Sequence, residues 1–407
     1  MNKTIWYISK YVTPTYAAKV GSRGFLLLRE FSKLGHTSVL ITSDSNHLAN
    51  PPKLQKPRYH EVIDGVNVLW LRTKKYGIAR SIGRMLSWLD FELQIFKIPK
   101  SELPQPDVII VSSLSLLTVI NGLRLSHRYK CKFVFEVRDI WPMILTEVGG
   151  ISNYNPFVLL LKWIEKIGYK KADLIVGVMP NLKEHVFEVT KTDRPVVCIP
   201  QGIDSGILDD IHSLDDEYIE KYIPKNKFVV CHAGSIGADN ALETLIECAK
   251  LMKDCVDIHF LIVGEGYKKS IFQIETGNMK NITFAPGVEK KKVQSVLKYS
   301  DVVYFAVHKN PVLRFGQALN KVIDYMLSGK PVIASFSGFP SMIDEAQCGS
   351  FVPAEDVASL RIEIERFAKM SFEERKRIGE RGRNWVLKNR KMETLANDYL
   401  HFMGIAS

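Results

Sequence analysis

The stretch PVLRFGQALNKVIDYMLSGKPVIA, residues 311–334, decides the fold. It predicts a loop, a helix over about residues 317–327, a helix-ending glycine at Gly329 and a strand over residues 331–335. A helix joined to a strand by a short connection is the repeating unit of sheets that carry helices on their faces. The stretch therefore predicts an α/β fold.

The same rhythm runs through the whole chain, where short apolar runs rich in β-branched residues alternate with amphipathic segments of helical length. The expected strands of the first half are residues 5–9, 38–42, 66–71, 108–112, 133–137, 174–178 and 196–200. Those of the second half are residues 228–232, 259–263, 282–285, 302–307, 331–335 and 351–353. Two doubly wound, Rossmann-like domains facing a central cleft are expected, joined through the Asp-rich residues 202–224.

Length and composition agree with a globular protein of two or three domains. The chain has 407 residues, 46% hydrophobic and 24% charged, which excludes a disordered tail protein and a membrane channel. No apolar run reaches the roughly 18–20 residues of a spanning helix, and residues 1–7 enter a strand without a basic and apolar leader, so export is not expected. The six cysteines form no CxxC pair and are expected to be reduced core thiols in a cytoplasm.

The net positive charge of the chain comes entirely from its first half. Residues 1–190 carry 26 basic and 15 acidic side chains, a net +11, whereas residues 191–407 carry 29 of each. Such asymmetry indicates an anionic partner, and residues 74–100 interleave cations with aromatic and aliphatic residues. They predict either a helix lying on an anionic membrane or a packed helix with a solvated basic face. No helix-turn-helix, RNP-like or zinc-finger pattern is present, so we expect no nucleic acid partner.

The opening stretch also carries candidate chemistry. A helix N-terminus attracts phosphate, and Lys321 and Arg314 would add positive charge beside it. Asn320 and Asp324 are four residues apart and share a helix face, which offers a carboxylate to vicinal hydroxyls. A surface crossover with solvated charges would give the same spacing.

These residues resemble the nucleotide-binding segment of the GT4 family of retaining GT-B glycosyltransferases, in the bacterial surface-polysaccharide branch whose helix reads SPNK…(E/D)YM.AGKPV. The similarity extends along the chain in the family's order. The further matching segments are KLGHTSVLITS (33–43), EVRDIWP (136–142), IPQGID (199–204), HAGSIG (232–237) and IVGEG (262–266).

The resemblance implies transfer of a sugar from a UDP-linked donor to a lipid-linked saccharide acceptor. Its first choice for that sugar is an N-acetylated amino sugar. Retention of configuration and a place in O-antigen, capsule or other lipopolysaccharide biosynthesis are implied with it. It also implies an acceptor domain over residues 1–203, a donor domain over residues 204–384 and a crossover helix at about residues 385–407. The expected location is the cytoplasm, peripheral on the inner face of the plasma membrane.

In the resemblance, Asp324 holds the donor ribose, while the first acidic position of the family is Gly316 here. Residues 238–241 lack the basic residue that relatives often carry, so Arg314 and Lys321 are expected to hold the diphosphate. The expected donor-binding residues are Ser235, Gly237, Gly264, Gly266, Gln317, Ala318, Leu319, Asn320 and Asp324.

The acceptor side is expected at the first-half segment EVRDIWP. Asp139 follows a strand, where a carboxylate could orient or deprotonate a hydroxyl, although an Arg–Asp surface pair is the alternative. With Asp139, the expected catalytic residues are Arg314 and Lys321. The expected acceptor-binding residues are Gly21, Ser22, Arg23 and Arg138, with Ser22 alternatively a helix N-cap.

No metal or cofactor is expected. The sequence contains no DxD-type pair at a strand end, no HExxH, no His/Cys cluster and no GxSxG, and His232 and His259 in apolar strands are expected to be satisfied core residues. A departing diphosphate can be stabilised by cations and helix ends alone. A nucleotide-sugar 2-epimerase with the same fold and a nucleotide-binding protein without turnover remain the alternatives.

Overall fold

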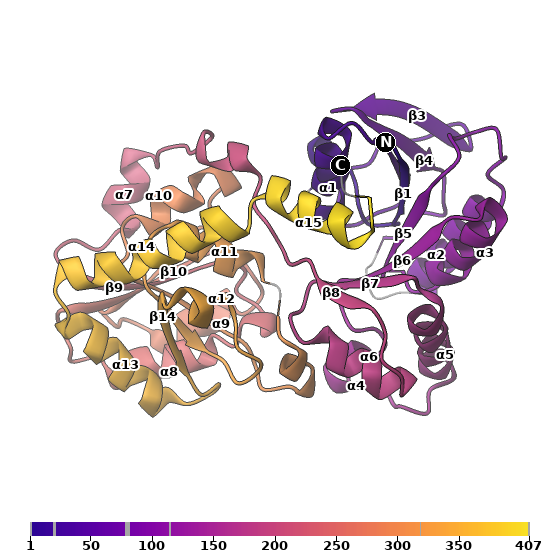
Figure 1. Cartoon of the computed structure of the whole chain (residues 1–407). Helices are drawn as coiled ribbons and strands as arrows, with labels where there is room; N and C mark the ends of the chain where they lie inside the picture. The colour runs from indigo at the N-terminus through magenta and orange to yellow at the C-terminus, as the bar shows by residue number, and fades with distance from the viewer. Residues whose placement is uncertain (1, 19–21, 78–81, 114, 318, 406–407) are drawn as a thin grey trace. The chain divides into compact units, whose positions relative to one another are not determined.

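The computed structural model describes residues 2–18, 22–77, 82–113, 115–317 and 319–405 (Figure 1). The chain divides into two compact units. Unit 1 comprises Met1–Gln201 together with Met392–Ser407, and unit 2 comprises Gly202–Lys391. The GT-B expectation of two Rossmann-like α/β domains is confirmed, because each unit contains a mostly parallel sheet flanked by helices.

Unit 1 holds an eight-stranded sheet in the order β3-β4-β2-β1-β5-β6-β7-β8. Only β3 runs antiparallel to its neighbour. The strand order reverses between β1 and β5, and ligands of such sheets bind beyond the carboxyl ends of the strands at this point. The strands are β1 (Thr4–Ile8), β2 (Thr37–Ser43), β3 (Arg58–Ile63), β4 (Val66–Leu71), β5 (Val108–Ser112), β6 (Lys132–Val137), β7 (Leu174–Gly177) and β8 (Val196–Cys198).

Helices cover both faces of this sheet (Figure 1). Helix α15 packs against α1 on one face, whereas α3 packs on β5 and contacts both α2 and α5 on the other. The helices of unit 1 are α1 (Arg23–Lys33), α2 (Ile82–Phe96), α3 (Thr118–Tyr129), α4 (Met143–Glu147), α5 (Pro156–Lys171), α6 (Leu182–Thr190) and α15 (Met392–Phe402), with a 3₁₀ turn η1 (Thr15–Ala17). The last helix of the chain thus completes the first unit.

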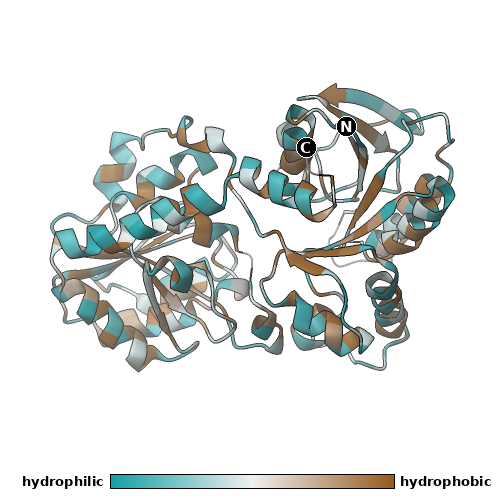
Figure 2. Ribbon diagram, viewed as in Figure 1, coloured by the Kyte–Doolittle hydropathy of each residue, from teal (hydrophilic) through white to brown (hydrophobic). Residues whose placement is uncertain are grey.

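Unit 2 holds a six-stranded parallel sheet in the order β11-β10-β9-β12-β13-β14. Its strand order reverses between β9 and β12. Its strands are β9 (Phe228–Ala233), β10 (Ile258–Val263), β11 (Ile282–Ala285), β12 (Val302–Ala306), β13 (Val332–Ser335) and β14 (Gly349–Val352). Apolar clusters line both faces, and Figure 2 shows the strands as the most apolar part of each unit.

The helices of unit 2 follow the strands in alternation. They are α7 (Asp216–Tyr222), α8 (Glu243–Leu251), α9 (Lys269–Thr276), α10 (Val293–Leu297), α11 (Asn320–Leu327), α12 (Met342–Ala346), α13 (Val357–Lys369) and α14 (Phe372–Asn389). Short 3₁₀ turns are η2 (Ser205–Leu208), η3 (Ala238–Asn240), η4 (Lys290–Lys292) and η5 (Pro311–Phe315). Residues 202–224, expected as a linker, therefore hold η2 and α7 and belong to unit 2.

Three expectations about elements are corrected. The strand β3 was not predicted. The helix expected over residues 317–327 begins at Asn320, because the preceding residues form η5 and Gly316 adopts φ +92°. The single helix expected at about 385–407 is two helices, and residues 385–391 belong to unit 2.

Candidate active site

The reversal between β9 and β12 marks the ligand edge of unit 2, and α11 is fastened to it. The Tyr325 hydroxyl, fully buried on α11, donates to the carbonyl of Ala233 at 3.0 Å and accepts from its amide at 2.9 Å. Because Ala233 is the last residue of β9, these two bonds fix the helix beside the HAGSIG turn. Both segments singled out from the sequence therefore belong to one site.

The expected donor residues Gly264 and Gly266 allow the turn after β10 to lie against the turn after β9. A Cβ on Gly264 would lie 1.8 Å from the Gly234 carbonyl, and one on Gly266 would lie 2.1 Å from the Ile236 carbonyl. Both glycines have positive φ, +152° and +158°. Any side chain there would separate the two turns, so these glycines shape the site whether or not they touch a ligand.

The first turn of α11 carries positive charge. Its N-cap residue, Leu319, makes no side-chain cap within the described chain, so the amide groups of the first turn have no capping oxygen. The Lys321 ammonium contacts the side-chain carbonyl of Asn240. The Asn240 amide in turn donates to the Ser235 carbonyl at 2.6 Å and to its hydroxyl at 2.8 Å. Asn240 thus links the HAGSIG turn to the cation, a role that the sequence did not reveal.

His232 contributes an unpaired nitrogen at the same place. Its ring is fully buried, and Nδ1 lies 3.3 Å from the Tyr304 carbonyl, while Nε2 has no hydrogen-bond partner among the described residues. Burial and then the charge of Lys321 lower the pKa of His232 to about 3, so the ring is neutral near pH 7. The core position was expected, but the expectation that the ring is satisfied is wrong. His259 is satisfied, through Thr283 Oγ1 at 2.9 Å.

Asp324, one turn after Lys321 on α11, pairs with Lys290. Burial raises the pKa of its carboxyl, and the ammonium of Lys290 opposes that rise. Its side chain is 14% exposed, and the Gln294 amide donates to its backbone carbonyl at 3.0 Å. A ligand hydroxyl that reaches Asp324 would share it with Lys290 or displace that ammonium.

We expect Asp324→Asn to weaken binding of UDP by roughly tenfold, because a charge-assisted hydrogen bond to ribose is lost while the side-chain shape is kept. Isothermal titration calorimetry with UDP measures this loss. Glu289→Gln, on the same side of the unit and outside the ion pair, serves as the control. If Asp324→Asn changes the melting temperature and leaves UDP affinity intact, Asp324 is a packing residue.

The remaining donor candidates differ in exposure. Arg314 is exposed, and its guanidinium lies 4.5 Å from the centre of the Phe315 ring. The Gln317 amide is buried without a hydrogen-bond partner among the described residues. Ser235 and Asn320 are exposed, and Gly237 and Leu319 are half-buried. Ala318 lies outside the described residues.

In unit 1, Asp139 lies beyond the carboxyl end of β6. Its half-buried carboxyl has a raised pKa because of burial, which the neighbouring Arg138 partly opposes. The buried Ser113 hydroxyl, just past β5, accepts from the Arg138 amide at 3.0 Å and donates to the Asp139 carbonyl at 3.2 Å. Arg138 Nε has no hydrogen-bond partner within the described part of the chain. These contacts fix the backbone of the turn, and the role of the Asp139 carboxylate in proton transfer stays a prediction.

Arg23 is a structural cation, which corrects its expected role in binding the acceptor. Its guanidinium is buried and donates to Glu136 at 2.7 Å, to the Ile199 carbonyl at 2.6 Å and to the Pro200 carbonyl at 3.2 Å. The Tyr399 hydroxyl of α15 reaches the same carboxylate at 3.3 Å. Since these contacts occupy the guanidinium, we assign Arg23 to the core.

The other expected acceptor residues lie in the same loop. Ser22 is buried at the N-cap position of α1, but its side chain makes no cap hydrogen bond to the described chain. Gly21 lies outside the described residues. Contact of Ser22 with an acceptor stays a prediction.

Lys10, at the carboxyl edge of the unit 1 sheet, is a buried lysine that was not predicted from the sequence. Lys10 directly follows β1 and its ammonium donates to Ser43 Oγ at 3.0 Å and to the Ser45 carbonyl at 2.8 Å. Burial lowers the pKa of Lys10 to about 7. A lysine just after an apolar strand was the available sequence signal, although spacing does not distinguish a buried lysine from an exposed one.

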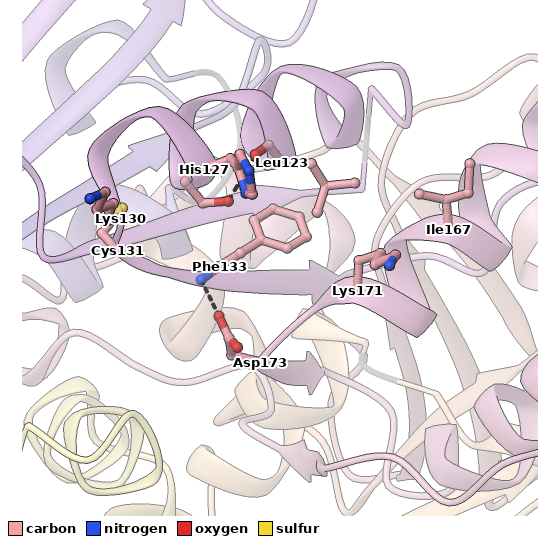
Figure 3. Close-up of a pocket in the computed structure, with 9 residues that line it drawn as sticks. Leu123, His127, Lys130, Cys131, Phe133, Ile167, Lys171 and Asp173 are labelled. Atoms are coloured by element: carbon pink, nitrogen blue, oxygen red, sulfur yellow. Dashed lines mark hydrogen bonds between the residues drawn. The ribbon is translucent and has the colours of Figure 1, made fainter.

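Within the described residues, a metal-ligand cluster is absent and a cavity of unit 1 lies away from its ligand edge. Among the described residues, no three His, Cys, Asp or Glu side chains are grouped so as to hold a metal. A cavity of about 600 Å³ lies between α3 and α5, lined partly by His127, Lys130 and Lys171 (Figure 3). It borders the start of β6, where the Phe133 amide donates to Asp173 at 2.8 Å, and so lies at the edge opposite Asp139. It belongs to neither ligand edge.

Two protein families match the two parts of the chain. The family described as Glycosyltransferase Family 4 matches residues 25–206, and Glycosyl transferases group 1 matches residues 215–385. Together with the fold, these matches make the chain similar to GT-B glycosyltransferases of the group 1, GT4-like type. An uncharacterized glycosyltransferase of Methanocaldococcus jannaschii is 23% identical over 245 residues, 58% of this chain and 60% of that protein's length.

Solved structures of low identity share the fold. Sucrose-phosphate synthase from Thermosynechococcus elongatus is 16% identical with a TM-score of 0.71, covering 98% of both chains. An Escherichia coli structure titled trehalose-6-phosphate, bound with UDP-2-fluoro glucose, is 12% identical with a TM-score of 0.73, also covering 98% of both. Anabaena HepE in complex with UDP and glucose is 14% identical with a TM-score of 0.64, covering 99% of this chain and all of that one.

Proposed function

We propose that this protein transfers a sugar from a UDP-linked donor to a lipid-linked saccharide acceptor with retention of configuration. An N-acetylated amino sugar is the first choice for the sugar. The proposed setting is surface-polysaccharide assembly at the inner face of the plasma membrane. Unit 2 would bind the donor and unit 1 the acceptor. The observation that carries the proposal is the uncapped first turn of α11, with Lys321 beside it, at the strand reversal of unit 2.

Two features of that turn suit a diphosphate leaving group. The free amides of a helix N-terminus attract anions, and Lys321 adds a full charge in a partly buried position. Such preorganised groups stabilise negative charge as it develops on the departing oxygen. His232 is neutral and its Nδ1 faces the Tyr304 carbonyl, so its Nε2 carries no proton and can only accept a hydrogen bond, as from a sugar hydroxyl. Metal independence stays a prediction, as does the ribose contact of Asp324.

The nucleotide is chosen from the comparisons. Solved structures with this fold are titled as complexes with UDP, with UDP-glucose and with UDP-2-fluoro glucose. Calorimetric titration of the purified chain with UDP, GDP and dTDP tests the proposal. We expect UDP to bind at least tenfold more tightly than the other two, and absence of binding by all three would contradict a nucleotide-sugar site.

Unit 1 also offers a surface for an anionic membrane. The exposed side of α2 is apolar and not basic, so the expected solvated basic face is wrong. Its exposed residues are Met85, Leu86, Leu89, Leu93 and Phe96, and on α5, which lies on the same face of the sheet, they are Leu159, Leu160 and Trp163. Exposed lysines follow α2, at Lys97 and Lys100, and lie among the exposed apolar residues of α5, at Lys162 and Lys166. Apolar side chains edged by cations suit a membrane interface.

The structure changes which residues should matter for docking. Lys75 is paired with Asp44 at 2.6 Å, and the Arg84 guanidinium lies over the Tyr11 and Trp88 rings. Among the described residues, no helix is long and apolar enough to cross a membrane. Docking would therefore depend on the apolar side chains, with the bordering lysines adding attraction that salt screens.

We expect Leu89→Ser combined with Leu93→Ser to lower partitioning into anionic vesicles by roughly tenfold or more, because two apolar side chains no longer enter the interface. Co-sedimentation measures the bound fraction. Leu251→Ser combined with Ile274→Ser, two apolar residues of unit 2 that are at least as exposed, is the control. Equal loss in both pairs, or none in either, rules out docking through α2.

A further inference from the structure

Three aromatic rings meet at the carboxyl edge of unit 1. The Trp88 ring of α2 lies edge-on to Trp141, with centroids 5.9 Å apart and planes at 80°. It stacks on Phe157 of α5 at 6.4 Å and 21°. Trp88 is 6% exposed and its indole nitrogen donates to Tyr11 Oη at 2.5 Å, whereas Trp141 and Phe157 are only half-buried. Trp88 is therefore held in place by burial and by its hydrogen bond, and the two more accessible rings, Trp141 and Phe157, pack against it.

At one end of this aromatic group, Trp141 adjoins Asp139, the candidate general base. Trp141 follows Asp139 by two residues, and its amide donates to the Asp139 carbonyl at 3.0 Å. Two residues span at most about 7 Å of chain, so the tryptophan and the carboxylate share one turn. Arg138 borders the same turn, with Nε lacking a partner among the described residues.

The other end runs into the exposed apolar helices. Phe157 is in the first turn of α5, and Leu160, one turn further, is exposed. On α2, Met85 and Leu89 flank Trp88 and are also exposed. A continuous apolar path therefore connects the turn of Asp139 with the surface that we propose for membrane docking. The Arg84 guanidinium lies 5.2 Å from the centre of the Trp88 ring, which brings positive charge to this path.

We propose that Trp141 and Phe157 form the acceptor subsite, in which a sugar ring stacks on Trp141 and the lipid passes Phe157 towards α2 and α5. This inference rests on the proposed function and specifies its acceptor. The two ring-to-ring steps are each about the width of a sugar ring, so the lipid begins within one or two sugars of the reacting hydroxyl. A long polysaccharide on its lipid would hold the hydroxyl far from the apolar surface.

The inference gives the protein an early place in assembly. An acceptor of one or two sugars on a lipid diphosphate must be supplied by a reaction that places a sugar phosphate on a polyprenyl phosphate. The product, one sugar longer, would leave this subsite for an enzyme whose acceptor site accommodates a longer glycan. The Arg84 guanidinium, over the Trp88 ring between Trp141 and Phe157, is placed where the diphosphate of so short an acceptor would pass.

Alkyl glycosides of N-acetylglucosamine, used below their micelle concentrations, test the subsite in the full-length protein. We expect the octyl glycoside to bind at least tenfold more tightly than the butyl glycoside, because each buried methylene adds up to about fourfold in affinity. Phe157→Ala should reduce this chain-length dependence. Trp141→Ala should weaken both glycosides by about three- to tenfold, since it removes the stacking face.

The control is Tyr129→Ala, a half-buried ring of unit 1 that packs edge-on to Trp6 at 5.3 Å and ends α3 just before β6 begins, at the opposite edge of the sheet. It should bind both glycosides as the wild type does. Should Trp141→Ala not fold, Trp141→Leu keeps an apolar side chain without the flat face and should show the same weakening. UDP titrations of the wild type and of these variants distinguish the two proposals. Absence of UDP binding by the wild type would contradict the donor site and not the acceptor subsite.

Octyl glycosides of one, two and three N-acetylglucosamine units test the length limit. We expect the first two to bind with similar affinity and the third several-fold more weakly. Tightest binding by the three-unit glycoside would overturn the short-acceptor inference. Chain-length independence in the wild type, or glycoside affinities unchanged in both Trp141→Ala and Phe157→Ala, would overturn the subsite itself.

Discussion

Asp139→Ala is expected to lower turnover by about 10²- to 10⁴-fold, the usual contribution of a positioned acid–base group, while UDP affinity stays as in the wild type. The carboxylate belongs to unit 1, whereas the proposed nucleotide site is built from residues of unit 2. Initial rates of UDP release under saturating donor measure the loss. A parallel loss of UDP affinity would contradict an acceptor-side role.

Asp139→Asn separates chemistry from folding. Burial raises the pKa of the Asp139 carboxyl, so its folded-state pKa exceeds its unfolded one and the ionised form opposes folding at neutral pH. The amide variant should therefore be at least as stable as the wild type near pH 7 and still nearly inactive. Activity of the wild type should fall as pH drops through the raised pKa, because the base becomes protonated. Asp64→Asn, in an exposed turn, is the control and should keep full activity.

Lys321→Ala is expected to weaken UDP binding by roughly tenfold or more, because it removes a charge-assisted contact worth about 1.5–3 kcal/mol to the diphosphate. It also releases Asn240, which holds the Ser235 turn. Arg314→Ala should have a smaller effect, since that guanidinium is exposed and lies on Phe315. Calorimetry with UDP ranks the two variants.

Lys250→Ala is the control for Lys321→Ala. It removes a lysine of the same unit that pairs with Glu247 at 2.7 Å on the surface of α8, and it should leave UDP affinity unchanged. Salt should weaken UDP binding less in Lys321→Ala than in the wild type, because one interacting charge is gone. If Lys321→Ala binds UDP with wild-type affinity, the diphosphate does not bind at the N-terminus of α11.

The sheets were predictable because buried parallel strands form apolar runs that stand out from their surroundings. The strand β3 escaped because its sequence mixes charged, aromatic and aliphatic residues and none of its six residues is fully buried. The turn Asp64–Gly65, with φ of +48° and +77°, was the available signal, since Asp-Gly between two apolar runs predicts a hairpin. The hairpin provides the only antiparallel pairing among the described strands.

The candidate sites were predictable in outline and not in detail. Motif order led to α11, the glycine turns and Asp139, because a ligand edge follows from strand order once the sheets are known. Local spacing does not reveal which cation is buried. Arg23 and Lys321 both stand near a helix start, yet one pairs with Glu136 in the core and the other faces the HAGSIG turn. The unpaired nitrogen of His232 also depends on packing that no spacing encodes.

The apolar face of α2 shows the same limit. Its sequence mixes aromatic, aliphatic and basic residues, and helical spacing alone allows either side to face the sheet. Tertiary packing buries Trp88 and Phe91 and leaves Leu89 and Leu93 exposed. Exposure, and with it the membrane proposal in its present form, came only from the structure.

The central claim is that this protein moves a sugar from a UDP-linked donor. Its most direct test is release of UDP from UDP-N-acetylglucosamine and related UDP-sugars by the purified chain, with and without lipid extract as the source of acceptor. The account predicts release that requires the extract and is lost in Asp139→Asn. Tight UDP binding with no extract-dependent release from any UDP-sugar would contradict it and favour a nucleotide-binding protein without transferase activity.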